Sequence, residues 1–186
     1  MKTILLGVTG SVAAIKVKQL AERLSEFAQV RIVMTHQAEY FLAHDLDAFK
    51  HLNITTYKDQ DEWPHLRARY QVGNPILHIE LRRWAECLIV APLSANTLAK
   101  IAHGFCDNLL TSVIRVWDWR KPMLLCPAMN TMMWENPPTA QHINLVKEWG
   151  AAIIEPIEKQ LACNDVGMGA MAEVEQIIDA IKKKIL

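Results

Sequence analysis

Long hydrophobic segments are absent from this sequence, and so is an excess of charge of either sign. The apolar runs, such as residues 87–91, fall far short of the ~20 residues of a membrane-spanning helix, so we expect no membrane partner. Lys and Arg together number 20, as do Asp and Glu, which leaves no net field to attract a nucleic acid. Residues 1–4 lead directly into a strand-like run without a cationic region or cleavage site, so we expect a cytoplasmic protein.

Cysteine pairs at metal-ligand spacing are absent as well. The four cysteines, Cys87, Cys106, Cys126 and Cys163, are widely separated and mostly lie in apolar runs. This pattern is typical of reduced thiols in a core and not of a disulfide framework. Because there is no C-x-x-C pair, we expect no metal site. The 186 residues are enough for one domain with its own core, and we expect a single domain over residues 1–186.

Short apolar runs alternate along the chain with segments of helical periodicity. The runs lie at residues 4–8, 30–34, 87–91, 123–126 and 151–154. The helical segments lie at residues 17–27, 98–102, 109–117, 143–149 and 174–185. Near-continuous apolar strands between amphipathic helices predict a Rossmann-like or flavodoxin-like α/β fold, a doubly wound parallel sheet with helices on both faces. In such sheets ligands bind beyond the carboxyl ends of the strands, so each segment that follows a strand is a candidate site wall.

Small residues follow the first strand-like run. Residues 7–14 form a turn that opens a helix, where free backbone N–H groups favour a phosphate. The turn lacks the G-x-G-x-x-G spacing, and the second strand ends in Met34-Thr35-His36, without an acidic residue for the ribose of a nicotinamide cofactor. A mononucleotide phosphate therefore fits better, although a plain strand-to-helix turn explains the segment equally well.

Two later strands also end in polar side chains. Residues 92–97 supply Ser, Asn and Thr, which are ordinary helix caps as well as ligand-binding groups. Residues 127–134 place Asn130 among three methionines and a tryptophan. The methionines can simply fill core gaps, or the amide can bind a carboxylate beside a flat ligand.

His78 and Cys163 are the remaining candidates for chemistry. An isolated histidine such as His78 is more often structural than catalytic, and its His-x-Glu lacks the downstream Pro-Cys-x-x-Cys of zinc deaminases. Cys163 lies between the last expected strand and the last helix, in a segment with Gly167 and Gly169. We expect a loop there that acts as a lid.

Taken in order, these segments resemble the flavin-containing cysteine decarboxylases, and within them the eukaryotic type that acts on phosphopantothenoylcysteine. The resembling stretches are residues 10–16, 77–85, 91–97, 106–110, 127–130 with Met133 and Trp134, and 161–173. The resemblance implies FMN as cofactor, with contacts from Gly10, Ser11, Val12, Thr35, His36, Gln37, Ser94, Ala95, Asn96, Thr97 and Ala128. It implies a substrate site of Asn130, Met133, Leu161 and Ala162, with His78 as catalytic base and Cys163 as proton donor. Family members are trimers or assemblies of trimers with the flavin at a subunit interface, which implies a homotrimer.

The reaction implied is decarboxylation of 4′-phospho-N-pantothenoylcysteine to 4′-phosphopantetheine in coenzyme A biosynthesis. The carbon that loses CO₂ has no neighbouring electron sink, so oxidation must come first. FMN is expected to take a hydride from the carbon that bears sulfur, CO₂ leaves from the resulting thioaldehyde, and the enethiol is reduced again. The chain departs from the family at Asn164, Val166 and Met168, which puts closure of the Cys163 loop in question.

Other functions are compatible with the same fold. Some relatives are regulatory proteins that inhibit phosphatases or subunits of mixed assemblies, but they tend to carry acidic extensions or lack a catalytic residue. A peptidyl-cysteine decarboxylase and a flavin prenyltransferase are further alternatives. The Asn130 segment followed by Cys163 favours cysteine decarboxylation over prenyl transfer.

Overall fold

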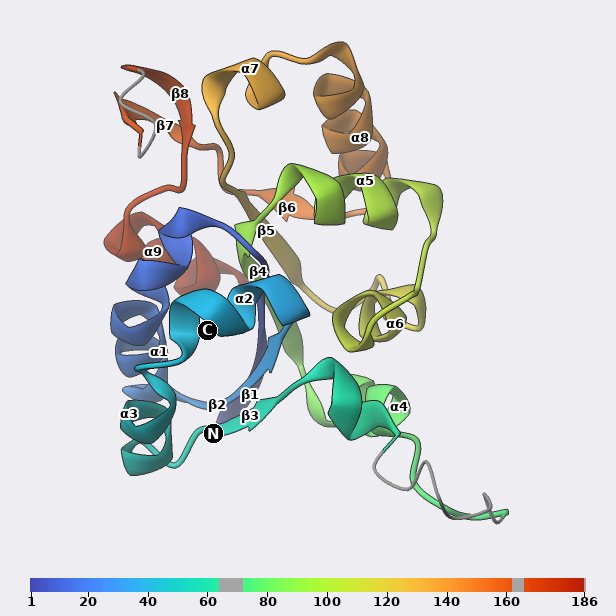
Figure 1. Cartoon of the computed structure of the whole chain (residues 1–186). Helices are drawn as coiled ribbons and strands as arrows, with labels where there is room; N and C mark the ends of the chain where they lie inside the picture. Colours follow the sequence, from blue (N-terminus) through green and yellow to red (C-terminus); the bar gives the residue numbers. More distant parts are fainter. Residues whose placement is uncertain (64–71, 162–165, 186) are drawn as a thin grey trace.

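The computed structural model describes residues 1–63, 72–161 and 166–185. Its centre is a six-stranded parallel sheet in the order β3-β2-β1-β4-β5-β6 (Figure 1). The strands are β1 (Lys2–Val8), β2 (Ala28–Met34), β3 (Thr55–Tyr57), β4 (Cys87–Leu93), β5 (Met123–Pro127) and β6 (Ala152–Ile153). The predicted doubly wound α/β sheet is confirmed.

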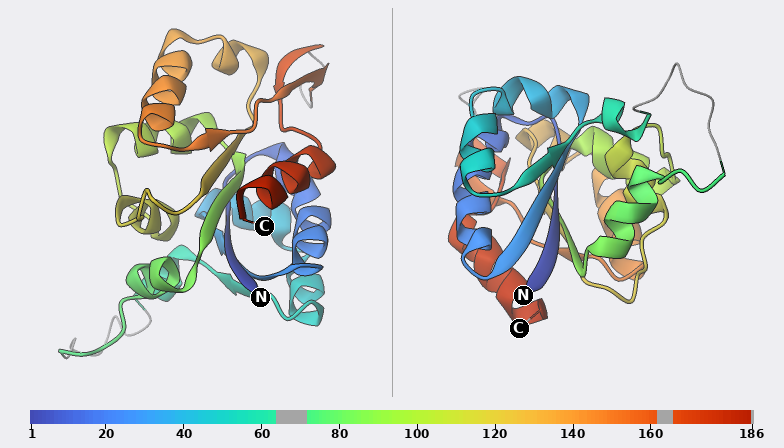
Figure 2. Two further views of the ribbon diagram at one scale, coloured as in Figure 1. Left: turned by 180° about the vertical axis from the view of Figure 1, so that it is seen from behind. Right: turned by 90° about the horizontal axis from the view of Figure 1, so that it is seen from below.

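Helices cover both faces of this sheet (Figures 1 and 2). One face carries α1 (Val17–Ser25), α2 (His36–Leu42), α3 (Leu46–His51) and α9 (Val174–Ile185). The other face carries α4 (Leu77–Trp84), α5 (Ala95–His103), α6 (Leu109–Arg115) and α8 (Pro137–Glu148). The short helices η1 (Val12–Lys16), η2 (Asp59–Glu62) and α7 (Thr131–Trp134) lie in the connections. No helix of these described ranges is long and apolar enough to span a membrane.

Each strand divides its side chains between two cores. In β1, Ile4 and Leu6 belong to the core under α1 and α9, whereas Leu5 belongs to the core under α4 and α6. This alternation follows from the two-residue period of a strand, and because both faces are covered the strand reads as a continuous apolar run. Cys87 and Cys126 are buried as expected, but Cys106 is exposed in the loop between α5 and α6, so the prediction of a core thiol is wrong there.

The direction in which successive strands are added to the sheet reverses between β1 and β4. Strands β2 and β3 follow β1 on one side, and β4, β5 and β6 run outward on the other. The carboxyl ends of β1 and β4 therefore border the crevice where doubly wound folds bind ligands. Hydrogen bonds join the two loops there: Thr9 Oγ1 donates to the carbonyl of Pro92 (2.8 Å) and accepts from the backbone N–H of Ser94 (2.8 Å).

An antiparallel hairpin lies apart from the main sheet. It consists of β7 (Ile157–Gln160) and β8 (Val166–Ala170), and β8 lies beside α7 (Figure 1). The sequence predicted a loop around Cys163 between the last strand and α9, and that prediction is wrong for residues 166–170, which form β8. Residues 162–165 of the predicted loop lie outside the described residues. The hairpin gives no apolar alternation in the sequence, since Glu158, Lys159 and Gln160 are all exposed.

Candidate functional site

The loops after β1 and β2 form one continuous surface at the carboxyl edge of the sheet. The backbone N–H of Thr35 donates to the carbonyl of Val8 (3.0 Å). Gly10 lies so close to Gln37, at the start of α2, that a side chain at residue 10 would overlap the Cβ of Gln37. Glycine is therefore required at position 10 for the two loops to meet.

Ser11 and Ser94 are the N-caps of η1 and α5, the helices that follow β1 and β4. Ser11 Oγ accepts from the backbone N–H of Ala13, and Ser94 Oγ accepts from that of Thr97, each at 3.3 Å. The helix-cap interpretation is thus confirmed for Ser94, and Ser11 caps the helix that the turn after β1 was predicted to open. A cap uses only part of the hydrogen-bonding capacity of such a turn, because the first N–H groups of a helix have no acceptor within the helix.

Thr35 supplies a buried hydroxyl at the same edge. The residue is 3% exposed, and its Oγ1 has no hydrogen-bond partner among the described residues. A buried hydroxyl without a partner costs free energy, about 1–3 kcal/mol, so it marks a position where a polar ligand group is expected. A phosphate or a hydroxyl of the flavin side chain fits this requirement. Gly10 lies in the neighbouring loop, which follows β1.

Asn130 lies at the end of β5 and caps α7. Its Oδ1 accepts from the backbone N–H of Met133 at 2.9 Å. This bond fixes the orientation of the amide and uses its oxygen as an acceptor. Nδ2 donates to none of the residues that the structure describes. The side chain therefore presents a hydrogen-bond donor, which suits a carboxylate.

A cavity of about 420 Å³ connects Asn130 with the loop after β1. Its lining residues are Ser11, Val12, Ala13, Ile15, Lys16, Ala128, Met129, Asn130, Lys159, Gln160, Leu161, Gly169, Ala170 and Met171. The lining is mainly apolar and includes two lysines and no acidic side chain. Such a cavity favours an anionic ligand with apolar parts.

Gly169 holds the hairpin against this cavity. Its carbonyl accepts from the backbone N–H of Met129 at 3.0 Å, and its φ of +137° is rarely adopted by other residues. A side chain there would also overlap the carbonyl of Met129. Lys159 and Gln160 of β7 thereby become cavity walls, and sequence reasoning missed both because the hairpin itself was not foreseen.

His78 lies at the start of α4, on the other face of the sheet from η1 and the hairpin (Figure 1). Its Nδ1 lies 2.6 Å from Oε1 of Glu62, and Oε2 of the same carboxylate accepts from the backbone N–H of His78 at 3.0 Å. Glu62 belongs to η2, and sequence reasoning did not single it out. His78 does not line the cavity that contains Asn130.

The predicted site residues thus lie in different parts of the structure. Those at the carboxyl ends of β1, β2, β4 and β5 share one edge of the sheet: Gly10, Ser11, Val12, Thr35, His36, Gln37, Ser94, Ala95, Asn96, Thr97, Ala128 and Asn130. Leu161 lines the cavity, and Met133 is 54% exposed on α7. His78 lies apart from them. The predictions for Ala162, Cys163 and Asn164 concern positions outside the described residues.

Neither buried cysteine is suited to chemistry. Burial raises the pKa of the Cys87 thiol to about 12. Burial also raises the pKa of Cys126 well above its ordinary value. Thiolates are the reactive form of cysteine, so both side chains are inert core groups near neutral pH.

Comparison with known families identifies the chain as a whole. The flavoprotein family model matches residues 1–186. The chain belongs to the flavoprotein family. This flavoprotein is 50% identical over 179 residues to the phosphopantothenoylcysteine decarboxylase of Arabidopsis thaliana, covering 96% of this chain and 83% of the relative. It is 48% identical over 181 residues to the phosphopantothenoylcysteine decarboxylase of Mus musculus, covering 96% of this chain and 85% of the relative.

Solved structures show the same relationship in three dimensions. A PPC decarboxylase mutant complexed with pantothenoylaminoethenethiol superposes with a TM-score of 0.88 at 47% identity, covering 98% of this chain and 97% of the other. The FMN binding protein AtHal3 superposes with a TM-score of 0.87 at 48% identity, covering 98% and 95%. The sequence resemblance to flavin-containing cysteine decarboxylases is therefore confirmed.

Proposed function

We propose that this flavoprotein is an FMN-dependent decarboxylase that converts 4′-phospho-N-pantothenoylcysteine to 4′-phosphopantetheine in coenzyme A biosynthesis. The observation that carries the proposal is the cavity that joins the Ser11 and Ala128 loops to the Asn130 amide and the lysines. It fits a ligand with a carboxylate, a phosphate and an apolar stem, placed beside a flat ring. Relatives that share about half of its residues over nearly the whole chain are named for this reaction.

FMN fits the carboxyl edge of the sheet. The phosphate would be held by the loop after β1, near Gly10, Ser11 and the unpartnered hydroxyl of Thr35. The loop after β4, from Ser94 to Thr97, would contact the rest of the cofactor. When bound, FMN supplies a reversible store for the two electrons that the carbon next to sulfur must release before CO₂ leaves and regain afterwards.

The substrate carboxylate would be bound by Asn130. Its Oδ1 is occupied by the α7 cap, so Nδ2 faces the ligand as a fixed donor. Such a contact positions the carboxylate and keeps it ionised until the carbon–carbon bond breaks.

The two cavity lysines would bind the phosphate of the substrate. Lys16 Nζ and Lys159 Nζ lie 2.7 Å and 3.2 Å from the two carboxylate oxygens of Glu173. The hydrogen bonds from Lys16 and Lys159 lower the pKa of Glu173, so this carboxyl is ionised at neutral pH. Two cations share one anion, which leaves a net positive charge at the rim of the cavity for a phosphate group.

A homotrimer would complete the site. In one chain His78 and Asn130 belong to different surfaces, so a base at His78 can reach the substrate of Asn130 only from a second copy. Exposed apolar side chains around the cavity support such a contact: Val12, Ile15, Met132 and Met133 are each about half exposed or more. In this arrangement the Glu62 carboxylate orients Nδ1 of His78 and leaves Nε2 to accept a proton.

Cys163 would donate the last proton to the reduced product. Replacement with serine would let CO₂ leave but stall the return of the electrons, so the oxidised enethiol would accumulate. Saturated product at the parental rate from Cys163→Ser would remove this role. His78→Asn, by contrast, would stop turnover before CO₂ release with FMN still bound.

The decisive experiment uses the purified protein alone. We expect visible flavin bands near one FMN per chain and release of CO₂ from 4′-phosphopantothenoylcysteine. Pantothenoylcysteine without its phosphate tests whether Lys16 and Lys159 bind that group. A peptide ending in cysteine tests the alternative of a peptidyl substrate. A folded but colourless protein that takes up no FMN would refute the proposal, and flavin without CO₂ release would indicate a subunit of a mixed assembly.

A further inference from the structure

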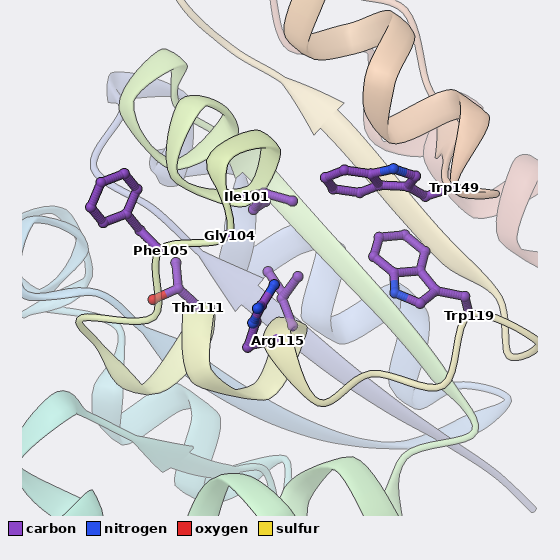
Figure 3. Close-up of a pocket in the computed structure, with 8 residues that line it drawn as sticks. Ile101, Gly104, Phe105, Thr111, Arg115, Trp119 and Trp149 are labelled. Carbon is purple, nitrogen blue, oxygen red and sulfur yellow. The ribbon is translucent and has the colours of Figure 1, made fainter.

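A second cavity lies between α5, α6 and the end of α8. It has a volume of about 400 Å³, within the range of roughly 300–1,000 Å³ of small-molecule pockets. Its walls include Ile101, Gly104, Phe105, Arg115, Trp119 and Trp149 (Figure 3). Nothing in the proposed decarboxylation uses these residues.

The second cavity is separate from the site at the carboxyl edge of the sheet. Trp119 lies shortly before β5, and Trp149 lies shortly before β6, so both belong to the amino ends of the strands. Ser94 and Ala128, which border the proposed flavin site, follow the carboxyl ends of β4 and β5. A ligand in the second cavity would not compete with the flavin.

Arg115 gives this cavity a positive charge. The guanidinium makes no ion pair and no hydrogen bond with any residue that the structure describes. Gly104, with φ of +73°, leaves it room, because a Cβ at that position would lie 2.9 Å from Nη1 of Arg115. A guanidinium presents five N–H donors in a planar fork that matches a carboxylate.

The aromatic walls define the rest of the ligand. Trp119 and Trp149 pack edge to face, with ring centroids 5.6 Å apart at 72°. Trp149 remains 37% exposed and Phe105 62% exposed, so ring surface is available to a ligand. Figure 3 shows Arg115 between Phe105 on one side and the two tryptophans on the other. Neither the Trp119 nor the Trp149 indole N–H has an acceptor among the described residues, so both are available as donors beside Arg115.

We propose that this second cavity binds a small aromatic carboxylate. The carboxylate would pair with Arg115, and the ring would lie against Trp149 and Trp119 (Figure 3). Charge complementarity selects an anion, since Arg115 is the charged side chain among the lining residues. The apolar and aromatic walls select a flat ring over a small inorganic anion, because aromatic side chains favour edge-to-face and offset contacts with other rings.

The test measures binding of indole-3-acetate to the FMN-saturated protein by calorimetry. Indole-3-acetamide is the control ligand, since it has the same ring and shape without the charge. We expect the acetate to bind about 10-fold or more tightly than the amide. Arg115→Gln should abolish this preference, whereas Arg120→Gln should retain it, because Arg120 is already paired with Asp118.

Three results would overturn the proposal. Equal affinities of the acetate and the amide, or an unchanged preference in Arg115→Gln at an unchanged melting temperature, would show that Arg115 binds no anion. The third result would show that another copy of the chain covers the cavity. If acrylamide quenches the wild-type protein no more than Trp149→Phe in the native oligomer, Trp149 is covered and the cavity is an interface.

Discussion

The Nδ1 of His78 lies 2.6 Å from Oε1 of Glu62, and the same carboxylate accepts the backbone N–H of His78. The Glu62 side chain is only 7% exposed, so water competes little for these bonds. A carboxylate on one ring nitrogen fixes the tautomer and the orientation of an imidazole and leaves the other nitrogen available as a base. If His78 is only structural, a change at Glu62 should leave catalysis unaffected. If His78 is the catalytic base, the same change should slow catalysis.

Glu62→Gln should lower kcat while leaving FMN binding intact. Glutamine keeps the shape but loses the charge that holds the ring, so we expect a decrease of about 10-fold to about 100-fold, part of what a general base contributes. Steady-state kinetics on flavin-saturated protein measure it, with KM little changed. Glu80→Gln is the control, since Glu80 lies on α4, the helix of His78, but pairs with Arg83 at the surface. Equal kcat values for the two variants would assign Glu62 a structural role only.

Asn130→Asp separates the cap of α7 from ligand binding. Aspartate caps helices as well as asparagine does, so Oδ1 should still accept from Met133 and the melting temperature should change little. The Nδ2 donor is lost and a negative charge faces the substrate carboxylate. We expect kcat/KM to fall by about 10-fold to about 100-fold or more. Asn136→Asp makes the same change at the N-cap of α8, and similar losses in both variants would contradict the assignment.

Much of this fold could be predicted from the sequence because its strands are buried on both faces. Apolar runs such as residues 4–8 and 87–91 are unambiguous when no polar residue interrupts them. The β7–β8 hairpin was missed because its exposed polar residues provide no such signal, and its position depends on the backbone contact between Gly169 and Met129. Contacts between distant segments leave no local pattern.

The site could be predicted in part for the same reason. Residues that follow β1, β4 and β5 had to meet at one edge once a parallel sheet was inferred. The contact between His78 and Glu62 joins two segments whose positions do not follow from the order of the strands. The position of Lys159 in the cavity wall depends on the hairpin. Only the resemblance to a family assigned a role to His78.

Thr35→Val tests whether the unpartnered hydroxyl belongs to the flavin site. Valine has the same shape without the polar atom, so the flavin-free protein should be as stable as the parent or more stable. If Thr35 binds FMN, the dissociation constant should rise by about 10-fold or more. Thr111→Val is the control, because Thr111 Oγ1 bonds to Asn108 within the structure. That variant should lose stability and keep its FMN affinity, and the opposite pattern would remove Thr35 from the site.

Gly169→Ala should detach the hairpin from the cavity. Alanine is strained at φ of +137°, and its Cβ would overlap the carbonyl of Met129. We expect a lower melting temperature and a raised KM, because Lys159 is carried by the hairpin. Gly73→Ala is matched for strain, since Gly73 has φ of +101° but no atom within 4 Å of the added Cβ. The KM should rise only in Gly169→Ala, and a similar rise in both would attribute the effect to backbone strain alone.

His142 on α8 should make the fold less stable in mild acid. Burial, followed by the nearby His103 ring, lowers the pKa of His142 in the folded protein. The two rings pack edge to face with centroids 4.9 Å apart. The unfolded chain takes up a proton at the ordinary histidine pKa of about 6.5, whereas the folded protein resists it, so stability falls as the pH drops through that value. The loss is complete below the folded-state pKa.

His142→Gln should reduce this loss, because glutamine does not titrate and can occupy the same half-buried position. Urea unfolding midpoints at about pH 7.5 and about pH 5 measure it, as the two values bracket the ordinary histidine pKa. The difference between the midpoints should be smaller in the variant than in the parent. His36→Gln, a change at a side chain that is 77% exposed, should leave the difference as it is in the parent. If the difference between the two midpoints is the same in His142→Gln as in the parent, the charge on this ring does not affect the packing of α5 against α8.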